Sequence, residues 1–257
     1  MTDWPRSAAA GLRNWRRTEA WRGDAVTWRL EHPDGRARYL KVAPEGTFPS
    51  LQAEADRMRW ASAYLPVPEV LELGREGGVE WLLTSALPGR SAVDDELQRD
   101  PASLVRALAR GLRRFHTAPV ASCPFDFRLE PAMTLVAERV RAGLVEPGRD
   151  LHPEHAGLTP EEALARLQRT PPRGEDLVVC HGDYCLPNAI LGEGEVTGYV
   201  DLGELGVADR WWDLAVAAWS VTWNLGPGWE ELFLSSYGVD PDPGRIAFYR
   251  LLYDLAS

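Results

Sequence analysis

Three side chains in one stretch of the chain are of the types that transfer phosphoryl groups. Asp183 lies in the run His181-Gly182-Asp183, Asn188 follows five positions later, and Asp201 comes after a second short apolar run. In kinase-type sites one aspartate orients the attacking hydroxyl, while an asparagine and a later aspartate hold the magnesium ions that bridge the nucleotide phosphates. Carboxylate and amide oxygens suit that cation. The pattern predicts Asp183 as the catalytic residue and Asn188 and Asp201 as magnesium ligands.

The elements around this stretch explain how the three groups could meet. Residues 177–180 form a buried type of strand that leads into the loop with Asp183. Residues 189–191 and 196–200 can pair around the Gly192-Glu193-Gly194 turn, which delivers Asp201. Such a hairpin predicts that both carboxylates lie on one rim of a cleft between two lobes.

A lysine and a glutamate upstream could complete the phosphate site. Lys41 lies in a predicted strand, residues 37–42, that pairs with residues 25–30 across a turn at 32–35. Glu54 lies on a predicted helix over 51–63. In kinases a strand lysine contacts the nucleotide phosphates and a helix glutamate holds it. The alternative is that the two side chains are exposed and never meet.

Two further segments have a functional and a plain structural interpretation. Gly23 lies in a turn where a kinase folds a loop over the ATP phosphates, and the same turn could be an ordinary surface turn. Residues 70–73 and 79–84 predict another strand pair, and Ser85, Ala86 and Leu87 follow it. Their backbone groups could pair with an adenine edge, or the segment could be a linker.

The chain order favours an α+β fold of two lobes, like that of protein kinases. Residues 1–87 would form a small N-terminal nucleotide-binding lobe with an antiparallel sheet, and residues 88–257 a larger, mostly helical catalytic and substrate-binding lobe. The expected helices of the second lobe have these bounds: 101–116, 131–144, one opening at Thr159, 209–223, 228–237 and 242–255.

Histidines and cysteines of the second lobe favour structural over metal-binding roles. We expect His116 to cap or pack at a helix end, and residues 145–158, which include His152 and His155, to form a solvated polar loop. Cys180 and Cys185 lack established zinc spacing.

Composition bounds the class of protein. The chain has 257 residues, 45% of them hydrophobic, and a net charge of −10, which argues against nucleic-acid binding and is compatible with a cationic small-molecule substrate. No apolar run is long enough to span a membrane, and Met1 to Trp4 begins no signal peptide. Three cysteines fit a reducing cytoplasm. We expect a cytoplasmic monomer.

The segment from Glu175 to Asp213 resembles the aminoglycoside phosphotransferases, most closely the 3'-phosphotransferase branch that inactivates kanamycin and neomycin. The resemblance is carried by His181-Gly182-Asp183, by Cys185-Leu186-Pro187-Asn188, and by Asp201 with the run from Leu205 to Arg210. It extends over nearly the whole chain. It implies ATP or GTP as phosphate donor, Mg²⁺, and antibiotic resistance.

The resemblance assigns roles to residues already singled out. Asp183 matches the catalytic aspartate, Lys41 the phosphate-binding lysine, and Glu54 its partner. Asp213 matches a helix aspartate that braces the catalytic loop. The adenine hinge and the magnesium ligands fall on the positions inferred above: Ser85 to Leu87, Asn188 and Asp201.

The sugar pocket departs from the family pattern. The helix after Asp213 carries Trp219, Ser220 and Trp223 where relatives present acidic residues, and the chain ends without the acidic and aromatic terminus that relatives use. The remaining candidates to hold substrate are all acidic: Asp150, Glu154, Asp183, Glu204 and Asp254. Two alternatives stay open: a kinase of the same fold for another small hydroxyl compound, such as an amino alcohol, sugar, macrolide or streptomycin-type aminoglycoside, and a non-catalytic nucleotide-binding protein.

Overall fold

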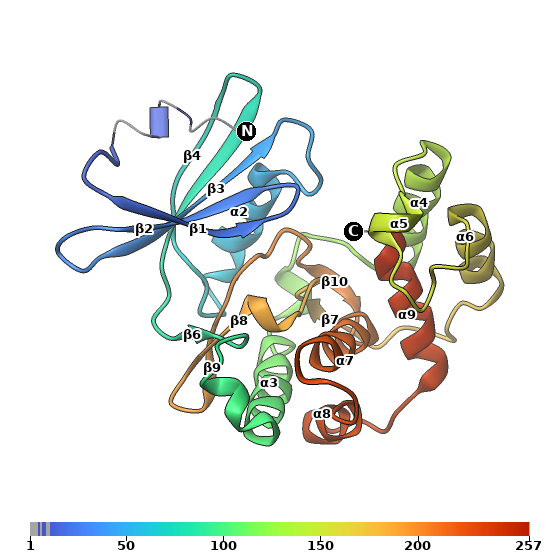
Figure 1. The fold of residues 1–257 in the computed structure, drawn as a ribbon. Coiled ribbons are helices and arrows are strands. Elements are labelled where there is room, and N and C mark those ends of the chain that lie inside the picture. The colour runs from blue at the N-terminus through green and yellow to red at the C-terminus, as the bar shows by residue number, and fades with distance from the viewer. Residues whose placement is uncertain (1–4, 6, 9–10, 257) are drawn as a thin grey trace. The chain divides into compact units, whose positions relative to one another are not determined.

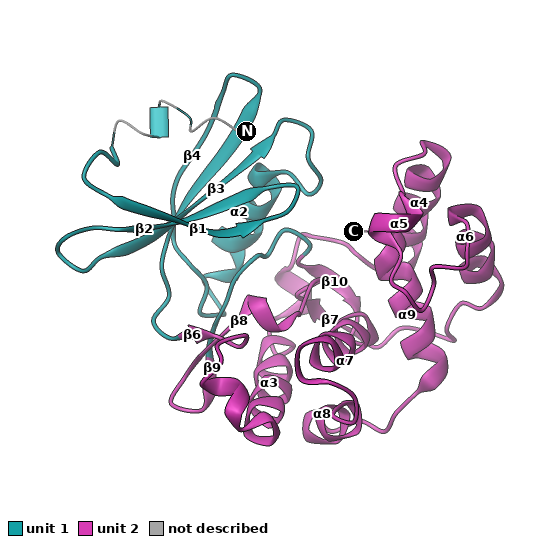
Figure 2. Ribbon diagram, viewed as in Figure 1, with its two compact units in different colours: residues 1–89, 197–204 teal, residues 90–196, 205–257 magenta. Residues whose placement is uncertain are grey.

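The computed structural model describes residues 5, 7–8 and 11–256, so the expectation for Met1 to Trp4 lies outside the described residues. The chain divides into two compact units (Figure 2). Unit 1 contains residues 1–89 and 197–204, and unit 2 contains residues 90–196 and 205–257. Unit 1 is therefore built from two separate segments of the chain.

Unit 1 contains an antiparallel sheet of five strands in the order β1-β2-β3-β5-β4 (Figure 1). The pairing places Lys41 of β3 opposite Leu82 of β5 and Thr27 of β2. The strands predicted in this region are all present. Their bounds are β1 (Arg16–Arg22), β2 (Val26–Glu31), β3 (Ala37–Pro44), β4 (Val70–Glu76) and β5 (Val79–Ser85).

Helix α2 (Leu51–Ala61) packs against β4 and β5. It begins where predicted, because the Ser50 side chain accepts a hydrogen bond from the Ala53 N–H and caps the helix. A second constraint acts at the same end, where the buried Glu80 carboxylate accepts the Leu51 N–H at 3.1 Å. These contacts fix the helix that carries Glu54.

Unit 2 is mostly helical, as predicted. Helix α3 packs against α8, and α7 packs against α9. The helices are α3 (Pro101–Phe115), α4 (Leu129–Arg141), α5 (Pro147–Asp150), α6 (Pro160–Arg169), α7 (Trp211–Leu225), α8 (Glu230–Tyr237) and α9 (Pro243–Ala256). None of the helices in the described part of the chain has the length and hydrophobicity needed to cross a membrane.

Short strands frame the loop that carries Asp183. β7 (Leu177–Cys180) pairs antiparallel with β10 (Gly206–Asp209). A second small sheet has the order β6 (Arg90–Ser91), β8 (Ala189–Gly192) and β9 (Glu195–Tyr199). β8 and β9 form at the hairpin that the sequence predicts, while β6 and β10 were not predicted.

Two details of unit 2 correct the sequence analysis. Asp209 does not cap a helix that starts at its own position, because it ends β10; its carboxylate still accepts the Trp211 N–H, at 3.0 Å. The prediction that residues 145–158 form a solvated loop is wrong. The segment contains α5, and its residues Val145, Leu151 and His155 are buried, so part of it belongs to the interior of the protein.

Candidate active site

Lys41, Glu54 and Asp201 form one cluster in unit 1. The Lys41 Nζ atom lies 2.9 Å from Glu54 Oε2 and 2.7 Å from Asp201 Oδ1. β3 supplies the lysine, α2 the glutamate, and the segment after β9 the aspartate. The predicted Lys41–Glu54 pair therefore exists, and the interpretation of two exposed side chains that never meet is wrong.

The electrostatics of this cluster keep the lysine charged. Burial by itself lowers the pKa of Lys41, but the charges of Asp201 and Glu54 outweigh burial and hold the pKa above its usual range. Glu54 is 5% exposed, and burial raises its pKa against the opposing charge of Lys41. The site thus presents a fixed ammonium group, which suits a lysine that contacts phosphate oxygens.

The backbone around Asp201 is tightly constrained. Asp201 adopts φ of 61°, in the left-handed region that residues other than glycine seldom occupy. Two residues later, a Cβ on Gly203 would lie 2.5 Å from Pro49 Cγ, so only glycine fits there. This combination aims the Asp201 carboxylate at Lys41.

In unit 2, Asp183 is held through both carboxylate oxygens. Asn188 Nδ2 donates a hydrogen bond to Asp183 Oδ2 at 2.8 Å and another to the Asp183 carbonyl at 3.0 Å. The Tyr253 hydroxyl donates to Asp183 Oδ1 at 3.0 Å. With its amide nitrogen used in this way, Asn188 has its side-chain oxygen left as a possible cation ligand.

Asp213, at the start of α7, braces the loop before Asp183. Its carboxylate is fully buried and accepts the His181 N–H at 2.7 Å and the Gly182 N–H at 2.9 Å. Trp212 adds a hydrogen bond from Nε1 to the Gly182 carbonyl at 2.8 Å. These are the contacts of a residue that fixes the loop backbone.

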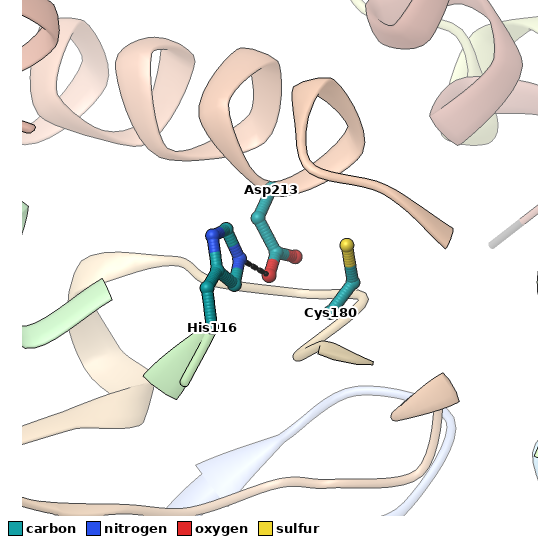
Figure 3. A group of neighbouring side chains, drawn as sticks. All are labelled: His116, Cys180 and Asp213. Carbon is teal, nitrogen blue, oxygen red and sulfur yellow. Dashed lines mark hydrogen bonds and ion pairs between the residues drawn. The ribbon is translucent and has the colours of Figure 1, made fainter. Parts of the chain in front are cut away.

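Figure 3 shows His116 and Cys180 beside Asp213. Ligand atoms of these three residues lie within 4.8 Å of one another, which is close enough to consider a metal ion. The His116 side chain, however, is bonded through both nitrogens, Nε2 to Asp213 at 2.9 Å and Nδ1 to the Tyr237 hydroxyl at 2.7 Å. Burial raises the pKa of the Cys180 thiol, which disfavours the thiolate that metals require. The cluster is therefore an extension of the Asp213 brace, and His116 is the helix-end residue that the sequence predicts.

The other predicted nucleotide contacts all lie in unit 1. Gly23 is in the turn between β1 and β2, where its N–H donates to the Ala25 carbonyl at 2.9 Å. Ser85 ends β5, and its N–H donates to the Glu69 carbonyl at 3.0 Å. Ala86 and Leu87 follow, and the Leu87 side chain packs on Gly198.

Most of the predicted substrate carboxylates are already hydrogen-bonded within the protein. Asp150 accepts the Glu146 N–H at 2.8 Å and pairs with Arg149 at 2.7 Å. Asp254 is 5% exposed and binds His155 Nδ1 at 2.7 Å. Glu204 is 9% exposed and belongs to unit 1, unlike the other predicted carboxylates.

An aromatic cluster of unit 2 joins Glu154 and Asp254. The His152 ring packs at a tilt against Trp219 and Trp223, with ring centroids 4.2 and 5.2 Å away, and the His152 backbone N–H donates to Asp254. Glu154 accepts the Trp219 indole N–H at 3.0 Å. The structure therefore brings these two acids to one aromatic cluster, in which Asp254 is buried and Glu154 stays exposed.

The sequence analysis did not identify two residues of helix α9, Tyr253 and Arg250. The Tyr253 bond to Asp183 joins residues 70 positions apart, and no periodicity or motif marks it. Arg250 is buried at 8% exposure, lies 5.1 Å from the Trp219 ring, and binds Glu230 at 2.9 Å. The sequence alone does not show that Arg250 lies on the buried face of α9.

Known proteins resemble this chain over almost its full length. The profile of the phosphotransferase enzyme family matches residues 18–249. An aminoglycoside 3'-phosphotransferase from Streptomyces fradiae is 42% identical over 228 residues, which cover 86% of this chain and 85% of the relative.

Two solved structures share the fold. A crystal structure of an aminoglycoside-3'-phosphotransferase of type VIII superposes with a TM-score of 0.88 at 35% identity and covers 97% of each chain. An aminoglycoside phosphotransferase from Streptomyces rimosus, in complex with ADP and streptomycin, has a TM-score of 0.78 at 32% identity, covering 97% of this chain and 95% of its own.

Proposed function

Because the chain belongs to the phosphotransferase enzyme family, we propose that it transfers the γ-phosphate of ATP to a hydroxyl of an aminoglycoside antibiotic, the 3'-hydroxyl of a kanamycin- or neomycin-type compound. The observation that carries the proposal is the Asp183 carboxylate, held at one oxygen by Asn188 and at the other by Tyr253, in a loop braced by Asp213. A carboxylate fixed in this way is suited to orient an attacking hydroxyl.

In the proposed step the acceptor hydroxyl oxygen attacks the γ-phosphorus of ATP. The bond from that phosphorus to the oxygen that bridges the β- and γ-phosphates breaks, and ADP leaves with this oxygen. The hydroxyl proton passes to the Asp183 carboxylate. In a loose transition state this proton moves late, so Asp183 contributes mainly by positioning the hydroxyl.

In this proposal most of the residues that contact the nucleotide belong to unit 1, and Asn188 is the contribution of unit 2. Lys41, held by Glu54 and Asp201, offsets negative charge on the phosphate oxygens. Asn188 and Asp201 each offer an oxygen ligand of the kind that magnesium takes, and the bound ion would neutralise the β- and γ-phosphates. Gly23 and the segment from Ser85 to Leu87 contact the phosphates and the adenine.

The 3'-hydroxyl assignment rests on the aminoglycoside 3'-phosphotransferases that resemble this chain, among them the 42% identical relative. The test is a coupled ADP-release assay with kanamycin, neomycin and streptomycin, followed by mass and NMR analysis of the product. We expect a phosphorylated 3'-hydroxyl with kanamycin. Turnover of streptomycin alone, or of no aminoglycoside, would overturn the assignment.

A matched pair of variants tests the role of Asp183. Asp183→Ala should abolish transfer and leave nucleotide affinity close to that of the wild type. Asp176→Ala is the control, since this residue lies outside the site and pairs with Arg210 at 2.7 Å. Expression of the wild type in a susceptible bacterium should raise kanamycin tolerance, and expression of Asp183→Ala should not.

A further inference from the structure

Tyr253, on helix α9, contacts the Asp183 carboxylate. No sequence motif links this helix to the loop that carries Asp183. The Tyr253 hydroxyl donates to Asp183 Oδ1 at 3.0 Å, while Asn188 Nδ2 donates to Oδ2 at 2.8 Å. An aspartate carboxylate turns easily about its terminal bond, because that torsion is broad. One donor alone would let the group pivot, whereas two donors on different oxygens fix its plane.

The phenol comes from a rigid part of unit 2. Tyr253 lies in the last turn of α9, between Leu252 and Leu255, which are both fully buried. The next residue, Asp254, accepts the His152 N–H at 3.0 Å and binds His155 Nδ1 at 2.7 Å. This anchorage fixes the helix end that aims Tyr253 at Asp183.

From this geometry we infer that Tyr253 is a positioning residue for phosphoryl transfer, which sets the plane of the Asp183 carboxylate in the acceptor complex. The inference rests on the proposed function, in which Asp183 orients the acceptor hydroxyl. A carboxylate offers about four lone-pair sites, so Oδ1 can accept the phenol and the acceptor hydroxyl together. Tyr253 therefore stays bonded during turnover and is not displaced by substrate.

This arrangement has a kinetic signature. The phenol contacts Asp183, and its removal changes the alignment of the attacking hydroxyl more than the binding of the antibiotic. Loss of alignment lowers kcat, whereas loss of binding raises KM. A merely structural role would instead lower thermal stability, or raise both KM values.

The test is the Tyr253→Phe variant, which removes one oxygen atom and keeps the ring. We expect kcat with kanamycin to fall about tenfold, the size that follows from losing a hydrogen bond to a charged group. We expect the KM values for kanamycin and ATP and the melting temperature to stay close to the wild type. Tyr249→Phe is the matched control, because it deletes a hydroxyl one helical turn earlier and, among the described residues, that hydroxyl is not bonded to Asp183.

The outcomes separate the inference from the proposed function. A wild-type kcat for Tyr253→Phe while Asp183→Ala is inactive overturns the inference alone. An equal loss of kcat in Tyr253→Phe and Tyr249→Phe also overturns it, since the effect would then be one of helix packing. A wild-type protein that phosphorylates no aminoglycoside, or an active Asp183→Ala variant, overturns the proposed function instead.

Discussion

Lys41 Nζ lies 2.7 Å from Asp201 Oδ1, although 160 positions separate the two residues in the chain. The same ammonium group binds Glu54 at 2.9 Å. One cation therefore pairs with two carboxylates from different elements of unit 1. Because both partners depend on this charge, Lys41 holds the 197–204 segment as well as helix α2.

Lys41→Met should impair catalysis and stability together. The substitution leaves Glu54 and Asp201 without their shared cation, and breaking such a pair costs about 2–4 kcal/mol of unfolding free energy. We also expect a higher KM for ATP and a lower kcat. Urea denaturation and steady-state kinetics measure the two effects. The control is Arg59→Met on α2, whose exposed pair with Asp56 should be worth less than about 1 kcal/mol.

Asp213→Ala should destabilise unit 2 without touching substrate. It leaves the His181 and Gly182 N–H groups and His116 Nε2 without their buried acceptor, at a cost of about 3–5 kcal/mol. The loop then loses its fixed geometry, so kcat should fall as well. Thermal unfolding and kcat are the measurements. Asp242→Ala removes a carboxylate that is about half exposed, and equal losses in both variants would contradict the brace.

Gly203→Ala should reduce activity by displacing the segment that carries Asp201. The new Cβ would stand 2.5 Å from Pro49 Cγ, which forces one backbone to move and costs about 1–3 kcal/mol. Gly148→Ala is a suitable control, because a Cβ there meets nothing within 4 Å. Melting temperatures and the KM for ATP test the difference. An alanine at position 203 with unchanged KM would show that the segment adapts without moving Asp201.

Acidification should destabilise the aromatic cluster through His152. Burial lowers the pKa of His152, although Asp254 and Glu154 oppose the shift. The unfolded chain therefore takes up its proton at higher pH than the folded one, and stability is present above pH ~6.5 and declines as the pH falls below it. Protonation also removes the acceptor for the Trp223 indole N–H, which lies 2.8 Å from His152 Nε2.

The pH effect can be measured by difference. Between pH 7.5 and 5.5 the melting temperature of the wild type should drop about 1–3 °C more than that of His152→Leu. Titrating groups distant from His152 act equally in both proteins and cancel. An identical drop in the two proteins would mean that His152 keeps its ordinary affinity for protons in the folded state.

Local signals explain which elements the sequence could predict. The helix starts predicted at residues 51, 101 and 159 are all present to within one residue. Each depends on neighbouring residues alone, because the side chains of Ser50, Asp100 and Thr159 cap these helices. The loop at 145–158 was misjudged because Val145 and His155 are buried by distant partners. His155 meets Asp254, 99 positions away, and nothing in its own surroundings reveals this.

The same distinction between local and distant signals applies to the residues of the candidate site. Asp183, Asn188 and Asp201 could be proposed as site residues because their spacing is a motif, and the Lys41–Glu54 contact could be predicted because kinases pair such residues. Asp150, Glu154 and Asp254 were selected by charge alone. The sequence does not show that each already has a partner inside unit 2, because those partners lie on other elements or are backbone groups.

The segment 197–204 belongs to unit 1, although the chain on either side of it belongs to unit 2. A fragment ending at residue 89 would consequently contain Lys41 and lack Asp201. Its complement would carry Asp201 and lack the lysine. A gene fusion, split reporter or exchange of halves between relatives that cuts near residue 89 would therefore produce two incomplete polypeptides. Recombination of this enzyme has to transfer residues 197–204 along with the first 89 residues.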